Sequence, residues 1–265
     1  MIYSEKEKNK IFEDINENGY SLLKNFYSKG QINKVKKSLL SMLNYIKPDD
    51  SVADLNEKYY QVKNYNKVLK GHFYDMCPFE LETLQLVHHP AILDLVKSYF
   101  KTDVVFSGGP GVHMRDAENE RELVGHQETH QFAKDFLFVW APLFDAKGEQ
   151  GGLVIYEKSH KHGYWQHNTK NPLGSSMVDP KILKKFKEKT VEVDSGSALL
   201  IHSRLIHASG KTAKKNFTKF VITDRICPLK VVPYLRNEDV PIKIPYPGHS
   251  EKGEDNDIDY QKIHD

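Results

Sequence analysis

Residues 136–140 read Phe-Leu-Phe-Val-Trp, a short apolar run rich in aromatic and branched side chains. Comparable runs recur through the second half of the chain with glycine, proline or charged residues between them, at 104–106, 153–156, 190–193, 198–202 and 218–223. Runs of this length are typical of β-strands, because branched and aromatic side chains pack well on a pleated surface. Many short strands in succession indicate a β-sandwich or barrel.

The N-terminal part has helical periodicity instead. Between residues 31 and 46 the apolar side chains recur at helical spacing, and Ser28 with Gln31 can form a capping box just before them. A second such pattern covers 90–100, and we expect a helical insert at about 179–188. The sequence therefore predicts a mainly β protein with N-terminal helices.

These patterns also suggest how the chain is organised. We expect one domain over residues 1–265, with a helical part to about residue 102 and a β core over about 103–227. The last stretch, about 228–265, is rich in charged residues and proline and has little periodicity, so we expect an irregular tail.

Composition excludes several classes of protein. Lys and Arg number 38 against 36 Asp and Glu, so a net charge of +2 gives no electrostatic reason to expect a nucleic-acid or membrane partner. The only cysteines, Cys77 and Cys227, exclude a disulfide framework and paired-cysteine zinc sites. No segment resembles a signal peptide or an apolar membrane span, so we expect a cytoplasmic protein with a small-molecule substrate.

Candidate metal ligands occur in two distant segments, at His126-Gln127-Glu128 and at His207. In an extended segment residues 126 and 128 point to the same side, so both can reach one ion. Two imidazoles and one carboxylate are the ligand set of the facial triad that binds non-haem Fe(II) and leaves positions open for reactants. We therefore predict a catalytic metal site formed by His126, Glu128 and His207.

The neighbourhood of this segment offers further candidates. His126 and His130 are spaced as in helical zinc proteases, but Gln127 stands where those enzymes need glutamate, and the flanking sequence is strand-like. His130 lies on the same side as His126 if the strand is regular, and either lines the substrate cavity or is structural. Phe132 and Arg115 are additional candidates for contact with the substrate.

Six segments, in the same order, resemble the phytanoyl-CoA dioxygenase family of Fe(II)- and 2-oxoglutarate-dependent oxygenases. The similarity runs from about Phe12 to Arg225 and lies in residues 12–46, 89–96, 126–130, 140, 151–163 and 196–210. The resemblance implies a double-stranded β-helix core, also called a jelly-roll or cupin-like core. It further implies Fe(II) at His126, Glu128 and His207, with 2-oxoglutarate and O2 as cosubstrates.

The resemblance also suggests cosubstrate residues and shows two departures. Trp140 and Ser209 match family positions that line 2-oxoglutarate. Glu128 replaces the usual aspartate and is one methylene longer. Thr218 stands at the position of the arginine that binds the distal carboxylate of 2-oxoglutarate, and it can donate only one hydrogen bond there. Either another cation reaches this carboxylate, with Lys219, Arg204, Arg225 and Arg115 as candidates, or the cosubstrate is held weakly or is a different one.

The expected activity is hydroxylation, or a related oxidation, of a small soluble metabolite. Relatives that halogenate lack the carboxylate ligand so that halide can bind, and this chain retains it as Glu128. Two alternatives remain open. Thr218 in place of the arginine is compatible with a metal-dependent enzyme of the same fold that does not use 2-oxoglutarate, and the fold also occurs in non-catalytic cupin-like binding proteins.

Overall fold

The computed structural model describes residues 3–103, 105–107, 109–118, 125–128, 135–165, 167–168 and 177–231. Helices precede sheets along the chain, as the periodicity predicts. Within these ranges the α-helices are α1 (Glu5–Asn18), α2 (Lys29–Ile46), α3 (Leu55–Tyr65), α4 (Lys67–Met76), α5 (Leu81–Val87), α6 (Pro90–Phe100) and α7 (Pro180–Leu183). Short 3-10 turns are η1 (Cys77–Phe79), η2 (Gly148–Gln150), η3 (Ser159–His162) and η4 (Leu229–Val231).

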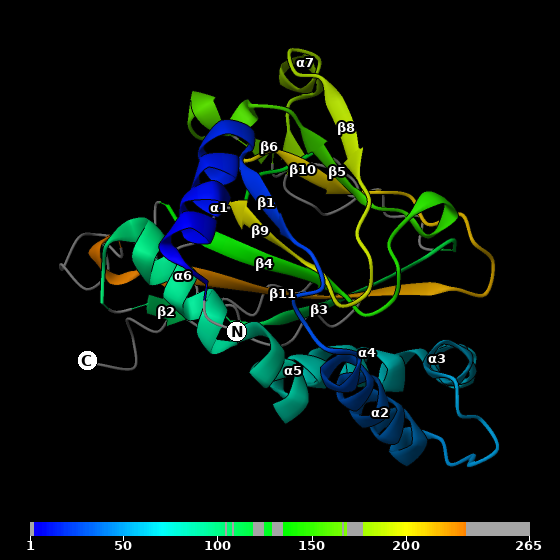
Figure 1. Cartoon of the computed structure of the whole chain (residues 1–265). Helices are drawn as coiled ribbons and strands as arrows, with labels where there is room; N and C mark the ends of the chain where they lie inside the picture. The colour runs from blue at the N-terminus through cyan, green and yellow to red at the C-terminus, as the bar shows by residue number, and fades with distance from the viewer. Residues whose placement is uncertain are drawn as a thin grey trace, which may run out of the picture.

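The strands form antiparallel sheets. They are β1 (Tyr20–Leu23), β2 (Val105–Ser107), β3 (Gly111–Asp116), β4 (Leu137–Pro142), β5 (Leu153–Tyr156), β6 (His167–Asn168), β7 (Met177–Val178), β8 (Glu188–Val191), β9 (Ala198–His202), β10 (His207–Ser209) and β11 (Thr218–Pro228). The large sheet has the order β1-β9-β4-β11-β2, with β3 also pairing with β11, and a smaller sheet has the order β10-β5-β8. Helices α2 to α5 lie on one side of the large sheet and the smaller sheet lies on the other (Figure 1).

Strand β11 shows how the two faces of the large sheet differ. Phe220 and Ile222 belong to the core that packs against the helices, whereas Val221 and Cys227 belong to a second core between the two sheets. Side chains alternate between the faces of a strand, so both faces of β11 are covered. The same holds for β4, in which all six residues are buried. Burial on both faces explains why these strands appear in the sequence as continuous apolar runs.

Local capping explains where the helices begin. The predicted capping box is present at α2, where the Ser28 side chain accepts from the Gln31 backbone N–H and the Gln31 side chain accepts from Ser28. The predicted helix at 90–100 is α6, with Pro90 in its first turn and the His89 side chain as its cap. Helix α1 ends at Gly19, which has φ of 83°, and this left-handed residue turns the chain into β1.

Two sequence-based predictions need correction. The insert expected at about 179–188 is helical only over Pro180–Leu183, and residues 185 and 186 close i to i+3 bonds to Ile182 and Leu183. The chain leaves the helix because β8 begins at Glu188 and pairs with β5. Strand β3 was not predicted. Its polar residues alternate with Val112 and Met114, so it lacks the continuous apolar run of strands such as β4.

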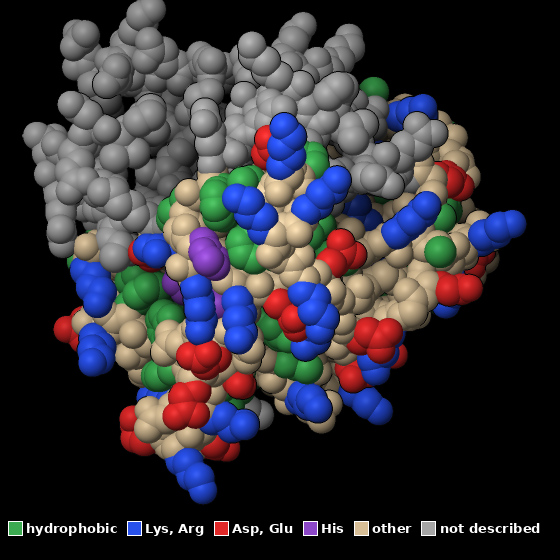
Figure 2. Space-filling model, turned by 90° about the horizontal axis from the view of Figure 1, so that it is seen from above, with side chains coloured by type: hydrophobic (Ala, Val, Ile, Leu, Met, Phe, Trp, Pro, Cys, Tyr) green, Lys and Arg blue, Asp and Glu red, His purple; other side chains and the backbone are tan. Residues whose placement is uncertain are grey.

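Surface features agree with the balanced composition. The face seen from the side of the smaller sheet shows Lys and Arg side chains mixed with Asp and Glu, so no single sign of charge covers it (Figure 2). Among the described helices, none combines the length and the apolar character that a membrane span requires. Most of the predicted tail, residues 232–265, lies outside the described ranges.

The packing of the helices on the large sheet can be tested at Phe220. This side chain is fully buried on β11, and its ring lies 5.4 Å from that of Tyr59 on α3 and 6.2 Å from that of Phe144. We expect Phe220→Ala to lower the free energy of unfolding by about 3–5 kcal/mol, because it leaves a cavity between helix and sheet. Chemical denaturation measures the change. Tyr45→Ala, at a position that is 91% exposed, is the control, and an equal loss there would contradict the account.

Candidate metal centre

Backbone hydrogen bonds bring the two predicted ligand segments together. The N–H of His126 donates to the carbonyl of His207 and the N–H of His207 donates to that of His126, both at 2.9 Å. The N–H of Glu128 donates to the carbonyl of Ser203 at 3.1 Å. Residues 125–128 are thus held as an extended segment beside β10. The predicted imidazoles and carboxylate lie together, with one ligand atom from each within 4.8 Å of the others.

Gln127, between the two ligands of this segment, faces the other way and fixes it. Its side-chain amide donates to the carbonyls of Gly163, at 2.8 Å, and Arg204, at 2.6 Å, and accepts from the N–H of Trp165 at 2.8 Å. Gln127 is buried. A buried amide with its hydrogen bonds satisfied holds the backbone in one register, so His126 and Glu128 are directed to the same side.

His207 is oriented for binding through Nε2. Its Nδ1 lies 2.9 Å from the carbonyl of Leu205, which directs the Nδ1–H to that oxygen and leaves the Nε2 lone pair for a metal. The ring of Phe138 lies 5.0 Å from the His207 ring and covers one of its faces. Burial, with the neighbouring His126, lowers the pKa of His207, so the imidazole is neutral at neutral pH and able to bind a metal.

The two carboxylate oxygens of Glu128 face different partners, one the two imidazoles and the other Arg225. Oε1 lies 3.8 Å from His126 Nε2 and 3.7 Å from His207 Nε2, whereas Oε2 lies 2.7 Å from Nε of Arg225. Burial alone would raise the pKa of the Glu128 carboxyl, but the charge of Arg225 and the two neighbouring imidazoles hold that pKa well below its ordinary value. The carboxylate is therefore ionised, as a metal ligand requires.

This donor set fits a divalent transition metal. It combines two imidazole nitrogens with one hard carboxylate oxygen, which is the facial-triad set of non-haem Fe(II) sites. A structural zinc site normally has four protein donors. Among the described residues, the cluster contains three such donors, so a bound ion would have positions left for other molecules.

Not all of the residues predicted to bind the cosubstrate lie on the side of the large sheet that faces the metal centre. Trp140 belongs to the core between the sheets, and Ser209 lies two residues beyond His207 on β10. Thr218 faces the helices instead, where its N–H donates to Asn56 Oδ1 of α3 at 2.5 Å. Lys219 points to the side of the metal centre. It is fully buried, and its Nζ donates to the carbonyls of Gly151, at 2.8 Å, and Gly210, at 2.9 Å.

The remaining candidate cations have different surroundings. Arg204 pairs with Asp135 through two nitrogen atoms, and Arg225 pairs with Glu128. Arg115 lies on β3 directly opposite Lys219 in the β3–β11 pairing. His130 and Phe132, which we predicted to contact the substrate, lie outside the described residues.

His113 is a site residue that the sequence did not reveal, and Arg225, expected there as a candidate cation for 2-oxoglutarate, pairs instead with the predicted ligand Glu128. His113 lies on β3 opposite Val221, and therefore on the side of β3 that faces the metal centre. Burial, aided by the charges of Arg115 and Arg225, lowers the pKa of His113 to about 4. The only sequence signal was the spacing of His113 and Arg115, two residues apart in a strand that we did not predict.

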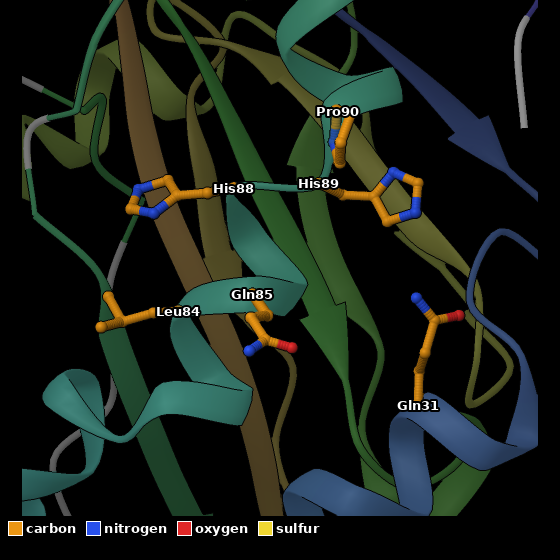
Figure 3. Close-up of a pocket in the computed structure, with 6 residues that line it drawn as sticks. All are labelled: Gln31, Leu84, Gln85, His88, His89 and Pro90. Carbon is orange, nitrogen blue, oxygen red and sulfur yellow. The ribbon is translucent and has the colours of Figure 1, made fainter.

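A surface pocket lies on the helix side of the large sheet, separate from this centre. It has a volume of about 480 Å³ and is lined by Gln31, Leu84, Gln85, His88, His89 and Pro90 (Figure 3). His88 Nε2 lies 2.7 Å from Oδ2 of Asp224, whose side chain faces the helices. Arg225, which follows Asp224 on β11, points to the other face of the sheet and contacts Glu128 there.

The family of the chain follows from comparison with known proteins. The model of the phytanoyl-CoA dioxygenase (PhyH) family matches residues 15–216, and the chain belongs to this family. Among curated proteins, no sequence matches this chain. The family assignment agrees with the resemblance seen in the sequence, and the candidate triad lies in the matched part of the chain.

Solved structures share the fold at low sequence identity. The epimerase SnoN, in complex with Fe3+, alpha-ketoglutarate and nogalamycin RO, has a TM-score of 0.60, 13% identity and coverage of 85% of each chain. The non-haem monooxygenase ThoJ has a TM-score of 0.58, 18% identity and coverage of 82% of this chain and 77% of its own. EvdO2 from Micromonospora carbonacea var. aurantiaca, complexed with 2-oxoglutarate, has a TM-score of 0.57 and 10% identity, with coverage of 93% of this chain and 98% of its own. These neighbours imply the family's double-stranded β-helix for the two facing sheets.

Metal binding at the triad should stabilise the folded protein. We expect Mn(II) or Co(II) at about a hundred times Kd to add about 2.7 kcal/mol, because the ion binds the folded state. Thermal unfolding with and without metal measures this gain. His126→Ala, Glu128→Gln and His207→Ala should each abolish it, whereas His162→Ala, at an exposed position, should not. A gain that survives all three triad substitutions would place the metal elsewhere.

His113 should contribute to acid sensitivity. Its pKa in the folded protein, about 4, lies below the ordinary 6.5, so the unfolded chain binds more protons between these values. Stability is therefore complete above about pH 6.5 and falls toward pH 4, by at most about 1.4 kcal/mol per pH unit from this group. We expect His113→Asn to flatten that slope in metal-free protein, measured by denaturation at several pH values. His72→Asn, at an exposed position, should leave the slope unchanged.

Proposed function

We propose that this protein is an Fe(II)- and 2-oxoglutarate-dependent dioxygenase that hydroxylates, or otherwise oxidises, a small molecule. The observation on which the proposal rests is the cluster of His126, Glu128 and His207, whose ligand atoms lie within 4.8 Å of one another. The chain belongs to the phytanoyl-CoA dioxygenase family, and two solved structures of the same fold are named as complexes with alpha-ketoglutarate or 2-oxoglutarate.

The metal and cosubstrate would supply the oxidising chemistry, and the protein's task is to hold, orient and shield them. His126, Glu128 and His207 would hold the metal. Phe138 covers His207 on one side, and an apolar core of Trp140, Leu153 and Ile155 lies between the two sheets beside it. Such a lining excludes water and strengthens the electrostatic interactions within the site.

Lys219 and Arg115 together are our candidates for binding the distal carboxylate of 2-oxoglutarate. They lie directly opposite each other on β11 and β3. Burial, aided by the charge of Arg115, lowers the pKa of Lys219 to about 8. Like charges opposite each other in a sheet destabilise it, and an anion between them would relieve the repulsion. Lys219 Nζ lies 2.9 Å from the carbonyl of Gly210, next to Ser209, which supports a shared carboxylate site.

The ligands argue against halogenation, but the structural neighbours do not narrow the type of oxidation further. The retained carboxylate of Glu128 favours hydroxylation or a related oxidation over halogenation, since halide would need that position. The neighbours are named as a monooxygenase, an epimerase and a carbocyclase. A fold that hosts different outcomes does not select one of them, and our proposal extends only to a small-molecule substrate.

A second candidate is a metal-dependent enzyme of this fold that does not use 2-oxoglutarate. Thr218 faces α3 rather than the metal centre. Lys219 already donates to backbone carbonyls, including those of Gly151 and Gly210. A carboxylate would have to replace these carbonyls as acceptors. Charged acceptors form stronger hydrogen bonds than carbonyls, which is why we favour the first candidate.

Anaerobic titration separates the candidates. For the first, Fe(II)-loaded protein should develop a visible charge-transfer band on addition of 2-oxoglutarate. Metal uptake without that band supports the second candidate, and absence of metal uptake supports a non-catalytic binding protein.

The same titration tests Lys219. We expect Lys219→Met to raise the Kd for 2-oxoglutarate by about 10- to 100-fold, because a hydrogen bond to a charged group contributes about 1.5–3 kcal/mol. Lys219→Arg keeps the positive charge and should retain most of the affinity for 2-oxoglutarate. It also keeps the test decisive if Lys219→Met does not fold. Lys181→Met, at an exposed position, is the control. Unchanged affinity in folded Lys219→Met would remove Lys219 from the cosubstrate site.

A further inference from the structure

The carboxylate of Glu128 is shared between the candidate metal centre and a buried arginine. Oε2 lies 2.7 Å from Nε of Arg225, while Oε1 faces both histidine Nε2 atoms at 3.7 and 3.8 Å. The side chains of Glu128 and Arg225 are 15% and 28% exposed, so water screens the pair only weakly. One oxygen is thus committed to Arg225 and the other is directed to the metal centre.

The strand on which Arg225 lies is anchored by its pairing with β4 and by the residue next to Arg225. On β11 it pairs with Phe138 of β4, whose ring packs against the ligand His207. The preceding residue, Asp224, is fully buried on the helix side, where Ser107 Oγ donates to its carboxylate at 2.8 and 3.0 Å. His88 lies 2.7 Å from the same carboxylate. These contacts hold the backbone of the strand, and from it the guanidinium of Arg225 reaches Glu128.

The number of oxygens that Glu128 offers to the metal matters for the reaction. An octahedral ion has six positions, and two imidazoles with one carboxylate oxygen leave three open. 2-Oxoglutarate bound through two atoms would occupy two of these, which would leave one for O2. A carboxylate that bound through both oxygens would leave only two positions, and the cosubstrate would fill them. Glutamate has one methylene more than aspartate, which gives its carboxylate more freedom to turn toward the ion.

We propose that Arg225 is a positioning residue that keeps Glu128 a one-oxygen ligand and so preserves the position needed for O2. The proposal rests on the proposed function. Arg225 takes Oε2 by a charge-assisted hydrogen bond, which leaves Oε1 as the oxygen available to the metal. The pair Arg204–Asp135 offers a matched comparison, because it is also a partly buried arginine–carboxylate pair but contains no triad residue.

The test uses Arg225→Gln, with Arg225→Lys as a second variant and Arg204→Gln as the control. One measurement is the Kd for Co(II) in the absence of cosubstrate. Without Arg225 both oxygens of Glu128 can bind the ion and a nearby positive charge is removed, so we expect Arg225→Gln to bind Co(II) about 10-fold more tightly than wild type. The other measurement is binding of nitric oxide to the anaerobic Fe(II) protein, followed by electron paramagnetic resonance, with and without 2-oxoglutarate.

The nitric oxide result distinguishes positioning from a general structural role. In Arg225→Gln we expect nitric oxide to bind the Fe(II) protein alone, but to lose most of its binding once 2-oxoglutarate is present, because no position remains. Arg225→Lys should recover part of this binding, and Arg204→Gln should behave as wild type. Equal nitric oxide binding in Arg225→Gln and wild type, or an equal loss in Arg204→Gln, would overturn the proposal.

Failure of the proposed function would look different. In that case the wild-type protein would bind metal and nitric oxide but show no charge-transfer band with 2-oxoglutarate. The Co(II) affinities would still test whether Arg225 orients Glu128. An unchanged or higher Kd for Co(II) in correctly folded Arg225→Gln, checked by circular dichroism, would count against the positioning role whatever the cosubstrate.

Discussion

The reciprocal backbone hydrogen bonds between His126 and His207 are the contact on which the candidate centre depends. They join two segments that are distant in the sequence, and they form an isolated bridge rather than a long ladder. Gln127 holds the same segment from its other side. Because residues 126 and 128 lie on one side of an extended chain, this single register directs both side chains at the imidazole of His207. A shift by one residue would turn both ligands away.

The helical half of the protein acts on the site through β11. One face of this strand packs Phe220 and Ile222 against the helices, and the other carries Lys219 and Arg225 toward the metal centre. The helices thus stabilise the sheet whose opposite face supports the ligands. Asp224 and Arg225, neighbours on the strand, are bound by partners on opposite faces. A stable core and a positioned cation are therefore two consequences of the same alternation of side chains.

The sequence predicted the parts that depend on local pattern. Continuous apolar runs predicted the strands that are buried on both faces, and the His126, Glu128 and His207 pattern predicted the triad. Contacts between distant charged side chains have no such pattern, so neither the Arg225–Glu128 pair nor the pairing of Arg204 with Asp135 could be predicted. Because side chains alternate along β11, Thr218 lies on the same face as Phe220, away from the site. The spacing from His207 that placed Thr218 at the position of the family's arginine does not show which face of the strand a residue occupies.

X-ray absorption at the iron edge of the anaerobic Fe(II)-loaded protein tests the central claim most directly. We predict a first shell with two imidazole nitrogens and one carboxylate oxygen from the protein, completed by water, and loss of one imidazole contribution in His207→Ala. A shell without imidazole, or one that is unchanged in His207→Ala, would contradict the assignment of His126, Glu128 and His207 as the metal ligands.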